Sequence, residues 1–183
     1  NNIAIQAGNK LMAFGCCYLS MECRTGKTLT ALYAADKFNA KSVLFITKLK
    51  AIPSVKSDYI ALQPSFKLEV VNFESSHKVT GKYDLVIIDE AHSLGAYPKP
   101  SKRTQEIRTI CEGLPVLYLS GTPSPESYSQ LYHQFWVCSK SPWKNYKSFY
   151  KWAKEYVYTR QKKVNGYLIN DYSCANKPKI DND

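Results

Sequence analysis

The chain has 183 residues, a length that suits one well-buried domain and excludes two of ordinary size. Its apolar fraction is 44%, no apolar run approaches the roughly 20 residues of a membrane-spanning helix, and its first residues lack the layout of a secretory signal, so we expect a cytoplasmic protein with no membrane partner. The formal net charge of +10 favours an anionic partner, although lysines on a solvated surface explain it equally well.

Short apolar runs recur along the chain and predict buried strands. These runs cover residues 16–21, 42–47, 68–73, 85–89 and 116–120. Helix-length stretches lie between them at residues 27–38 and 104–111, and strand alternating with helix predicts an α/β fold with a parallel sheet. Beyond residue 123 the pattern becomes helical and aromatic, over residues 128–137 and 146–158.

The composition changes near residue 139. We therefore divide the chain into a core, residues 1–138, and a basic, aromatic, helical extension, residues 139–183, whose polar tail from residue 170 is typical of a linker. The extension carries ten Lys or Arg residues and four Asp or Glu residues. Phe149, Trp152 and Tyr156 fall at helical spacing, which favours packing on the core over the alternative of stacking on nucleic-acid bases.

The segment Glu22-Cys23-Arg24-Thr25-Gly26-Lys27-Thr28 directly follows a predicted strand and opens a predicted helix. A P-loop has this context, because its backbone N–H groups and the positive end of its helix hold phosphates. We expect Lys27 on the β- and γ-phosphate oxygens, the Thr28 hydroxyl on Mg²⁺, and Gly26 where a Cβ would crowd the phosphate. The match is incomplete, since Met21 replaces the first glycine of the pattern G-x-x-x-x-G-K-S/T.

Two more strand ends carry polar residues. Asp89 and Glu90 end the run at 85–89, with His92 close behind, and Ser120-Gly121-Thr122-Pro123 ends the last run. Ligands of open α/β sheets bind at the carboxyl ends of strands. Asp89 is therefore expected to hold Mg²⁺, and Glu90 to orient and deprotonate the water that attacks the γ-phosphate. Each segment alone could be a plain solvated loop, but the three in order indicate a nucleotide site.

These three segments resemble motifs I, II and III of the superfamily-two helicases, and the Gly-Thr-Pro form is similar to the Snf-family translocases. Arg24-Thr25-Gly26-Lys27-Thr28 is also similar to compact phage-type members. The similarity covers roughly residues 16–138, with residues 43–48 resembling motif Ia. It implies a three-layer, RecA-like P-loop NTPase lobe with Lys27, Asp89 and Glu90 as catalytic residues. It also implies that His92, Ser120 and Thr122 couple nucleotide state to motif III. The residues it places on nucleic acid are Thr47, Lys48, Lys50 and Asn72.

The resemblance implies an ATP-binding lobe that couples ATP hydrolysis to movement on nucleic acid, DNA being favoured over RNA. Nothing after Pro123 resembles motifs IV to VI, so a second RecA-like lobe is an expected partner and weak hydrolysis is expected of this chain alone. Two alternatives stay open: a non-catalytic nucleotide- or DNA-binding module and a non-translocating P-loop phosphotransferase. The six cysteines lack zinc-site spacing and disulfide-scaffold density, so we expect reduced thiols and no structural metal.

Overall fold

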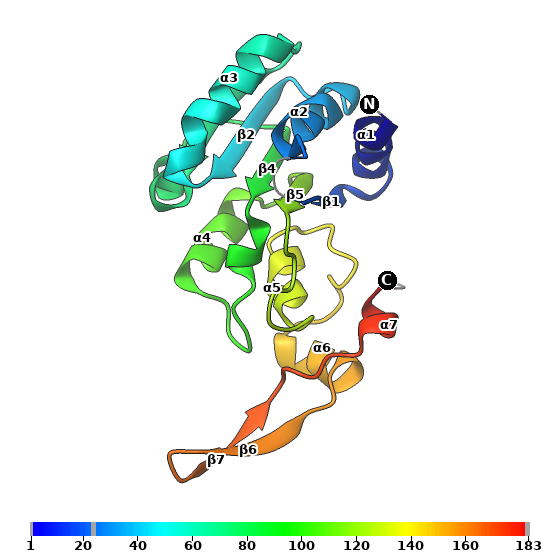
Figure 1. Cartoon of the computed structure of the whole chain (residues 1–183), viewed down its shortest axis with the longest axis vertical. Helices are drawn as coiled ribbons and strands as arrows, with labels where there is room; N and C mark the ends of the chain where they lie inside the picture. Colours follow the sequence, from blue (N-terminus) through cyan, green and yellow to red (C-terminus); the bar gives the residue numbers. More distant parts are fainter. Residues whose placement is uncertain (1, 23–24, 182–183) are drawn as a thin grey trace.

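A wholly parallel, five-stranded sheet forms the centre of the computed structural model, which describes residues 2–22 and 25–181 (Figure 1). Its strand order is β1-β5-β4-β2-β3. The strands are β1 (Cys16–Ser20), β2 (Ser42–Thr47), β3 (Lys67–Asn72), β4 (Leu85–Asp89) and β5 (Val116–Ser120). The parallel α/β prediction is thus confirmed, and each strand agrees with its predicted range to within one residue.

Helices and short 3-10 turns connect the strands. They are α1 (Asn2–Phe14), α2 (Lys27–Lys37), η1 (Leu49–Ala51), α3 (Ile52–Leu62), η2 (Phe73–Lys78), η3 (Ala91–Leu94), α4 (Lys102–Ile110) and α5 (Gln130–Trp136). Sequence analysis missed α1 and α3. The buried face of α1 consists mostly of small residues, and a Cβ added at Gly8 would lie 2.9 Å from Lys37 Cβ, so α1 packs closely on α2 through residues that carry little apolar signal.

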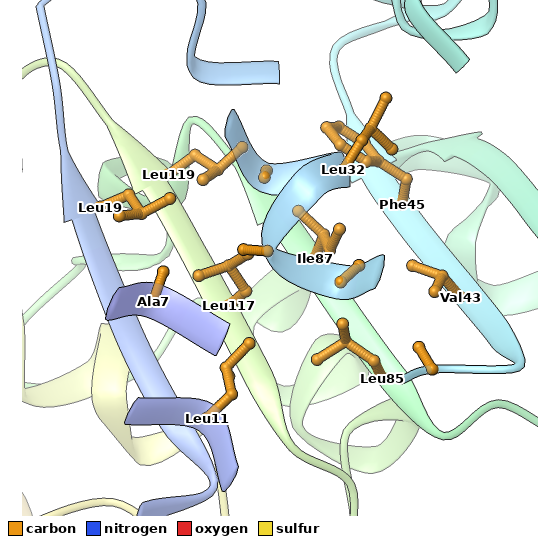
Figure 2. Close-up of a cluster of buried hydrophobic side chains, with 14 of the residues drawn as sticks. Ala7, Leu11, Leu19, Leu32, Val43, Phe45, Leu85, Ile87, Leu117 and Leu119 are labelled. Carbon is orange, nitrogen blue, oxygen red and sulfur yellow. The ribbon is translucent and has the colours of Figure 1, made fainter. Parts of the chain in front are cut away.

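Both faces of the sheet are covered, which gives three layers. Leu19, Phe45 and Ile87 belong to one core, together with buried residues of α1, α2 and α3 (Figure 2). Ile46 and Ile88, one position further along their strands, belong to a second core with η3, α4 and the end of α5. This explains why β2, β4 and β5 are continuous apolar runs: successive side chains point to opposite faces, and both faces of these strands are buried. Each such buried side chain stabilises the fold by about 1.5–3 kcal/mol.

An aromatic cluster joins the C-terminal part to α5. Trp152 of α6 (Phe149–Tyr156) is fully buried and stacks on Tyr156 with ring centroids 5.1 Å apart. Tyr132 of α5 lies 5.3 Å from the Trp152 ring, which places the cluster against the core. The predicted packing of the aromatic stripe is therefore confirmed, since its side chains are buried and not free to stack on bases.

The extension is not wholly helical, and its tail is not an irregular linker. β6 (Arg160–Val164) and β7 (Tyr167–Asp171) form an antiparallel hairpin, and α7 (Lys177–Asp181) follows. The turn Asn165-Gly166 has positive φ at both residues, the conformation that two-residue hairpin turns need and that Asn-Gly supplies. Ile180 of α7 is buried in the aromatic cluster. One apolar residue in a polar tail thus gives α7 its anchor, which composition alone could not predict.

None of the helices within the described residues combines the length and apolar character that crossing a membrane requires.

Candidate functional site

The carboxyl edge of the sheet brings the predicted motifs together. In the parallel register Ser20 lies opposite Ser120, and Asp89 lies opposite Leu119. At the other side of β4, Thr47 at the end of β2 lies opposite Asn72 at the end of β3. Because β5 lies between β1 and β4, the Ser120 end separates the loop after β1 from the acid pair after β4.

The loop between β1 and α2 has a left-handed glycine at its end. Gly26 has φ 80° and ψ 30° and precedes α2, and its carbonyl accepts a hydrogen bond from Thr30 N at 2.9 Å. Earlier in the loop, Thr25 Oγ1 donates to the Glu22 carbonyl at 2.7 Å. No described protein atom lies within 4 Å of a Cβ built on Gly26, so the need for glycine is conformational within this chain. Cys23 and Arg24 lie outside the described residues.

Asp89 is held at the sheet edge by Thr47. The Thr47 hydroxyl donates to Asp89 Oδ2 at 2.8 Å, and the Thr47 side chain is fully buried. Burial raises the pKa of Asp89, while the Thr47 hydrogen bond and the charge of Lys27 act in the opposite direction. Lys27 and Asp89 therefore share one electrostatic environment. Thr47 faces Asp89 and not solvent, so its side chain is not available for the nucleic-acid contact expected from the sequence.

Glu90 has an unusual backbone conformation for its residue type. Its φ of 53° and ψ of 42° are left-handed, a region that costs a non-glycine residue about 1–3 kcal/mol. The strained backbone turns the chain directly after β4, so that Glu90 and Asp89 need not point the same way. The Glu90 carboxylate lies 3.3 Å from His92 Nδ1 and 3.8 Å from Lys48 Nζ. Strain of this kind is maintained only where surrounding contacts hold it.

A continuous chain of polar contacts runs from Glu90 to the end of β5. His92 Nδ1 lies 2.9 Å from Ser120 Oγ, and Ser120 Oγ accepts from Thr122 N at 3.1 Å. The same ring nitrogen of His92 therefore lies within reach of both the Glu90 carboxylate and the Ser120 hydroxyl. His92 thus lies between the acid pair and the Ser-Gly-Thr-Pro segment.

The same chain extends to α5 through two residues that sequence analysis missed. The side chain of Ser120 also lies near Tyr18, whose hydroxyl donates to Gln134 Oε1 at 2.6 Å. Burial raises the pKa of Tyr18, and the nearby Ser120 side chain opposes that rise. Gln134 Nε2 in turn donates to the Pro123 carbonyl at 2.7 Å. The role of Gln134 has no local sequence signal, because two of its partners, Tyr18 and Pro123, are more than ten residues away along the chain and only the Gln130 carbonyl is local.

Comparison of the sequence with family models and with curated proteins gives no match.

The remaining predicted contacts lie on the outer part of the same edge. Lys48 and Lys50 are exposed, and Asn72 is partly buried, with Nδ2 donating to Glu74 Oε2 at 3.0 Å. Arg103 pairs with Glu74 at 2.9 Å and so offsets its charge. The two lysines and Asn72 are thus placed at neighbouring strand ends. Lys48 alone among them contacts the acid pair.

The oxygen atoms at the site suit a hard cation. Within residues 2–22 and 25–181, no group of three or more His, Cys, Asp or Glu side chains is arranged to hold a metal ion. Mg²⁺ usually takes one or two protein oxygens and completes its shell with water and substrate phosphates. The Asp89 carboxylate, whose burial disfavours an uncompensated negative charge, fits that requirement, and Thr28, the second residue of α2, is the hydroxyl expected from the sequence.

Proposed function

We propose that this chain is the ATP-binding lobe, RecA-like in fold, of a nucleic-acid-dependent ATPase of the helicase or DNA-translocase type. The observation that carries the proposal is the continuous set of contacts from Glu90 through His92 to Ser120, at the edge that also holds Lys27. An acid pair in a merely solvated loop has no need of such a connection. An ATPase motor does, because its catalytic acid must be linked to elements that respond to the nucleotide.

In this proposal the phosphates of ATP lie at the N-terminus of α2, where free N–H groups and the helix dipole attract anions. Lys27 contacts the β- and γ-phosphates. Thr28 and Asp89 hold Mg²⁺, which when bound neutralises charge on the phosphates. Thr47 fixes the orientation of Asp89. Glu90 accepts the proton of the attacking water, since its carboxylate is partly exposed and separate from that of Asp89.

Nucleic acid would approach the edge formed by Lys48, Lys50 and Asn72. Exposed lysines contact backbone phosphates without reading sequence, which suits a protein that moves along its partner. The Lys48 ammonium lies 3.8 Å from Glu90, so a phosphate bound by Lys48 would lie close to the catalytic base. This proximity supports nucleic-acid dependence as part of the proposal.

The experiment is steady-state phosphate release from Mg-ATP by this chain, with and without saturating DNA. We expect slow release with little DNA stimulation, because an arginine finger is worth about 10³–10⁵ in rate and no motif VI-like arginine is present in the sequence. The release should disappear in Glu90→Gln. ATP binding without any Glu90-dependent release would favour the non-catalytic module. Transfer of phosphate to a small acceptor in preference to water would favour the phosphotransferase.

A further inference from the structure

The outer edge of β1 is open. Among the described residues β1 pairs with β5 alone, so it is an edge strand of the sheet. Val116 N donates to the Gly15 carbonyl and Met21 N donates to the Ser120 carbonyl, each at 3.1 Å. Because backbone groups of a parallel strand alternate between its two sides, the N–H and C=O groups of Cys16, Tyr18 and Ser20 point away from β5. Within the described part of the chain, no backbone group pairs with them there.

A cavity of about 670 Å³ lies beside this edge. Its walls come from the end of α1, from β1, from α5, from residues 140–144 and from α7, and Figure 1 shows α1 and α7 on the β1 side of the molecule. Apolar lining residues include Phe14, Leu131, Phe135 and Trp143. Phe14 is 67% exposed, so a large aromatic ring is left in contact with water at the mouth of the cavity. If the edge of β1 were already covered, this apolar surface beside it would not need to be exposed.

The rim of the cavity is positive. Lys10, Lys140 and Lys144 line it and are exposed, while Asp181 is the one acid among the described lining residues. None of the three lysines belongs to an ion pair within the described chain. Lys140 lies next to the start of β1, because a Cβ on Gly15 would lie 2.1 Å from Lys140 Cδ and the Lys140 carbonyl accepts from Cys16 Sγ at 3.6 Å.

We propose that the β1 edge and this cavity bind an extended, acidic polypeptide segment of a partner protein, which adds to the sheet as a sixth strand. The outward N–H and C=O groups of β1 supply the ladder, the cavity takes alternate apolar side chains, and the lysines pair with acidic ones. Nucleic acid would satisfy the lysines but has no peptide groups for the strand edge. The site lies beside the flank of the sheet, away from the Asp89–Glu90 edge, so the proposal does not depend on the proposed ATPase function.

The binding test uses two fluorescein-labelled twelve-residue peptides, one alternating valine with glutamate and one alternating valine with lysine, without nucleotide. The glutamate peptide should bind and the lysine peptide should not. The double change Lys140→Glu with Lys144→Glu should weaken binding by about tenfold or more, since like charges then face each other. The matched control, Lys78→Glu with Lys82→Glu, makes the same charge change at exposed sites outside the cavity and should leave binding unchanged.

Hydrogen exchange then tests the strand pairing itself. On binding the glutamate peptide, the amides of Tyr18 and Ser20 should become protected, whereas those of Cys17 and Leu19, already directed at β5, should not change. Binding with no alternation between these amides would overturn strand addition. Absence of glutamate-peptide binding would overturn the site, and equal competition by oligothymidylate would show that any polyanion suffices.

Discussion

Replacing Thr47 with valine would remove one hydroxyl group from a fully buried position while keeping the shape of the side chain. The hydroxyl donates to Asp89 Oδ2 at 2.8 Å, and water cannot take its place without a rearrangement of the sheet edge. A hydrogen bond to a charged group contributes about 1.5–3 kcal/mol to stability, against about 0.5–1.5 kcal/mol for a neutral pair. We expect Thr47→Val to lower the free energy of unfolding by an amount in the higher range at pH 8.

The cost should depend on pH with a defined sign. Burial already raises the folded-state pKa of Asp89 above its ordinary value, and loss of the Thr47 bond raises it further. The folded variant therefore binds a proton more readily than the folded wild type, so the penalty is complete above the folded pKa and shrinks as pH falls through it. At pH 4 the cost of Thr47→Val should approach that of a neutral hydrogen bond.

Urea denaturation at pH 8 and pH 4, without Mg²⁺, measures this difference. Thr104→Val is the matched control, because Thr104 is equally buried and its hydroxyl donates to the neutral Leu94 carbonyl at 3.1 Å. Its cost should be smaller and the same at both pH values. Thermal melting gives a second estimate, at about 2–4 °C per kcal/mol for a chain of this size. Equal, pH-independent costs for the two variants would refute the assignment of an ionised, Thr47-bound Asp89.

Three further predictions concern other parts of the fold. His133 is buried and its pKa is lowered to about 4, so as the pH falls the unfolded chain takes up a proton before the folded chain does. The free energy of unfolding should therefore fall by about 3 kcal/mol between pH 6.5 and 4. In urea denaturation, the stability of His133→Phe should depend less on pH than that of the wild type. Gly26→Ala should lower the free energy of unfolding by about 1–2 kcal/mol, because Gly26 has a left-handed backbone, and should weaken ATP binding in titrations. Gly113 has φ 74° and equally open space, so Gly113→Ala should lower stability by the same amount and leave ATP binding intact. Ser120→Ala removes the acceptor of the Thr122 amide, so exchange of that amide should speed up; unchanged exchange would argue against the bond at 3.1 Å.

The sheet was predictable because its physical cause is local. The inner strands β2, β4 and β5 are almost wholly buried and are therefore short, continuous apolar runs, while the edge strands β1 and β3 are partly buried but still carry an apolar run each. α1 escaped because alanine and glycine form its buried face, so its burial depends on close approach to α2 and not on bulky side chains. The hairpin at β6 and β7 escaped because β6 is mostly polar and the short apolar run of β7 is exposed, although Asn165-Gly166 was a usable turn signal.

The candidate site was predictable up to the strand ends. The motif positions gave Lys27, Asp89 and Ser120, and parallel pairing brought their strand ends to one edge. The contacts between these residues could not be derived from the sequence. Thr47 points inward to Asp89, and Gln134 of α5 contacts Tyr18, because distant segments of the chain pack together. Side chains at strand ends can face solvent or a neighbouring strand, and one sequence does not decide between these.

The measurement that tests the central claim most directly is equilibrium binding of a fluorescent, non-hydrolysable ATP analogue with Mg²⁺ to Lys27→Ala and Glu90→Gln. Lys27→Ala deletes a contact to the bound phosphates and should weaken binding by about tenfold or more, since a charge-assisted contact to phosphate is worth about 1.5–3 kcal/mol. Glu90→Gln removes only the base for the attacking water, so its affinity should stay close to that of the wild type while hydrolysis is lost. Equal loss of binding in both variants, or no loss in Lys27→Ala, would contradict the assignment of a nucleotide site at this edge of the sheet.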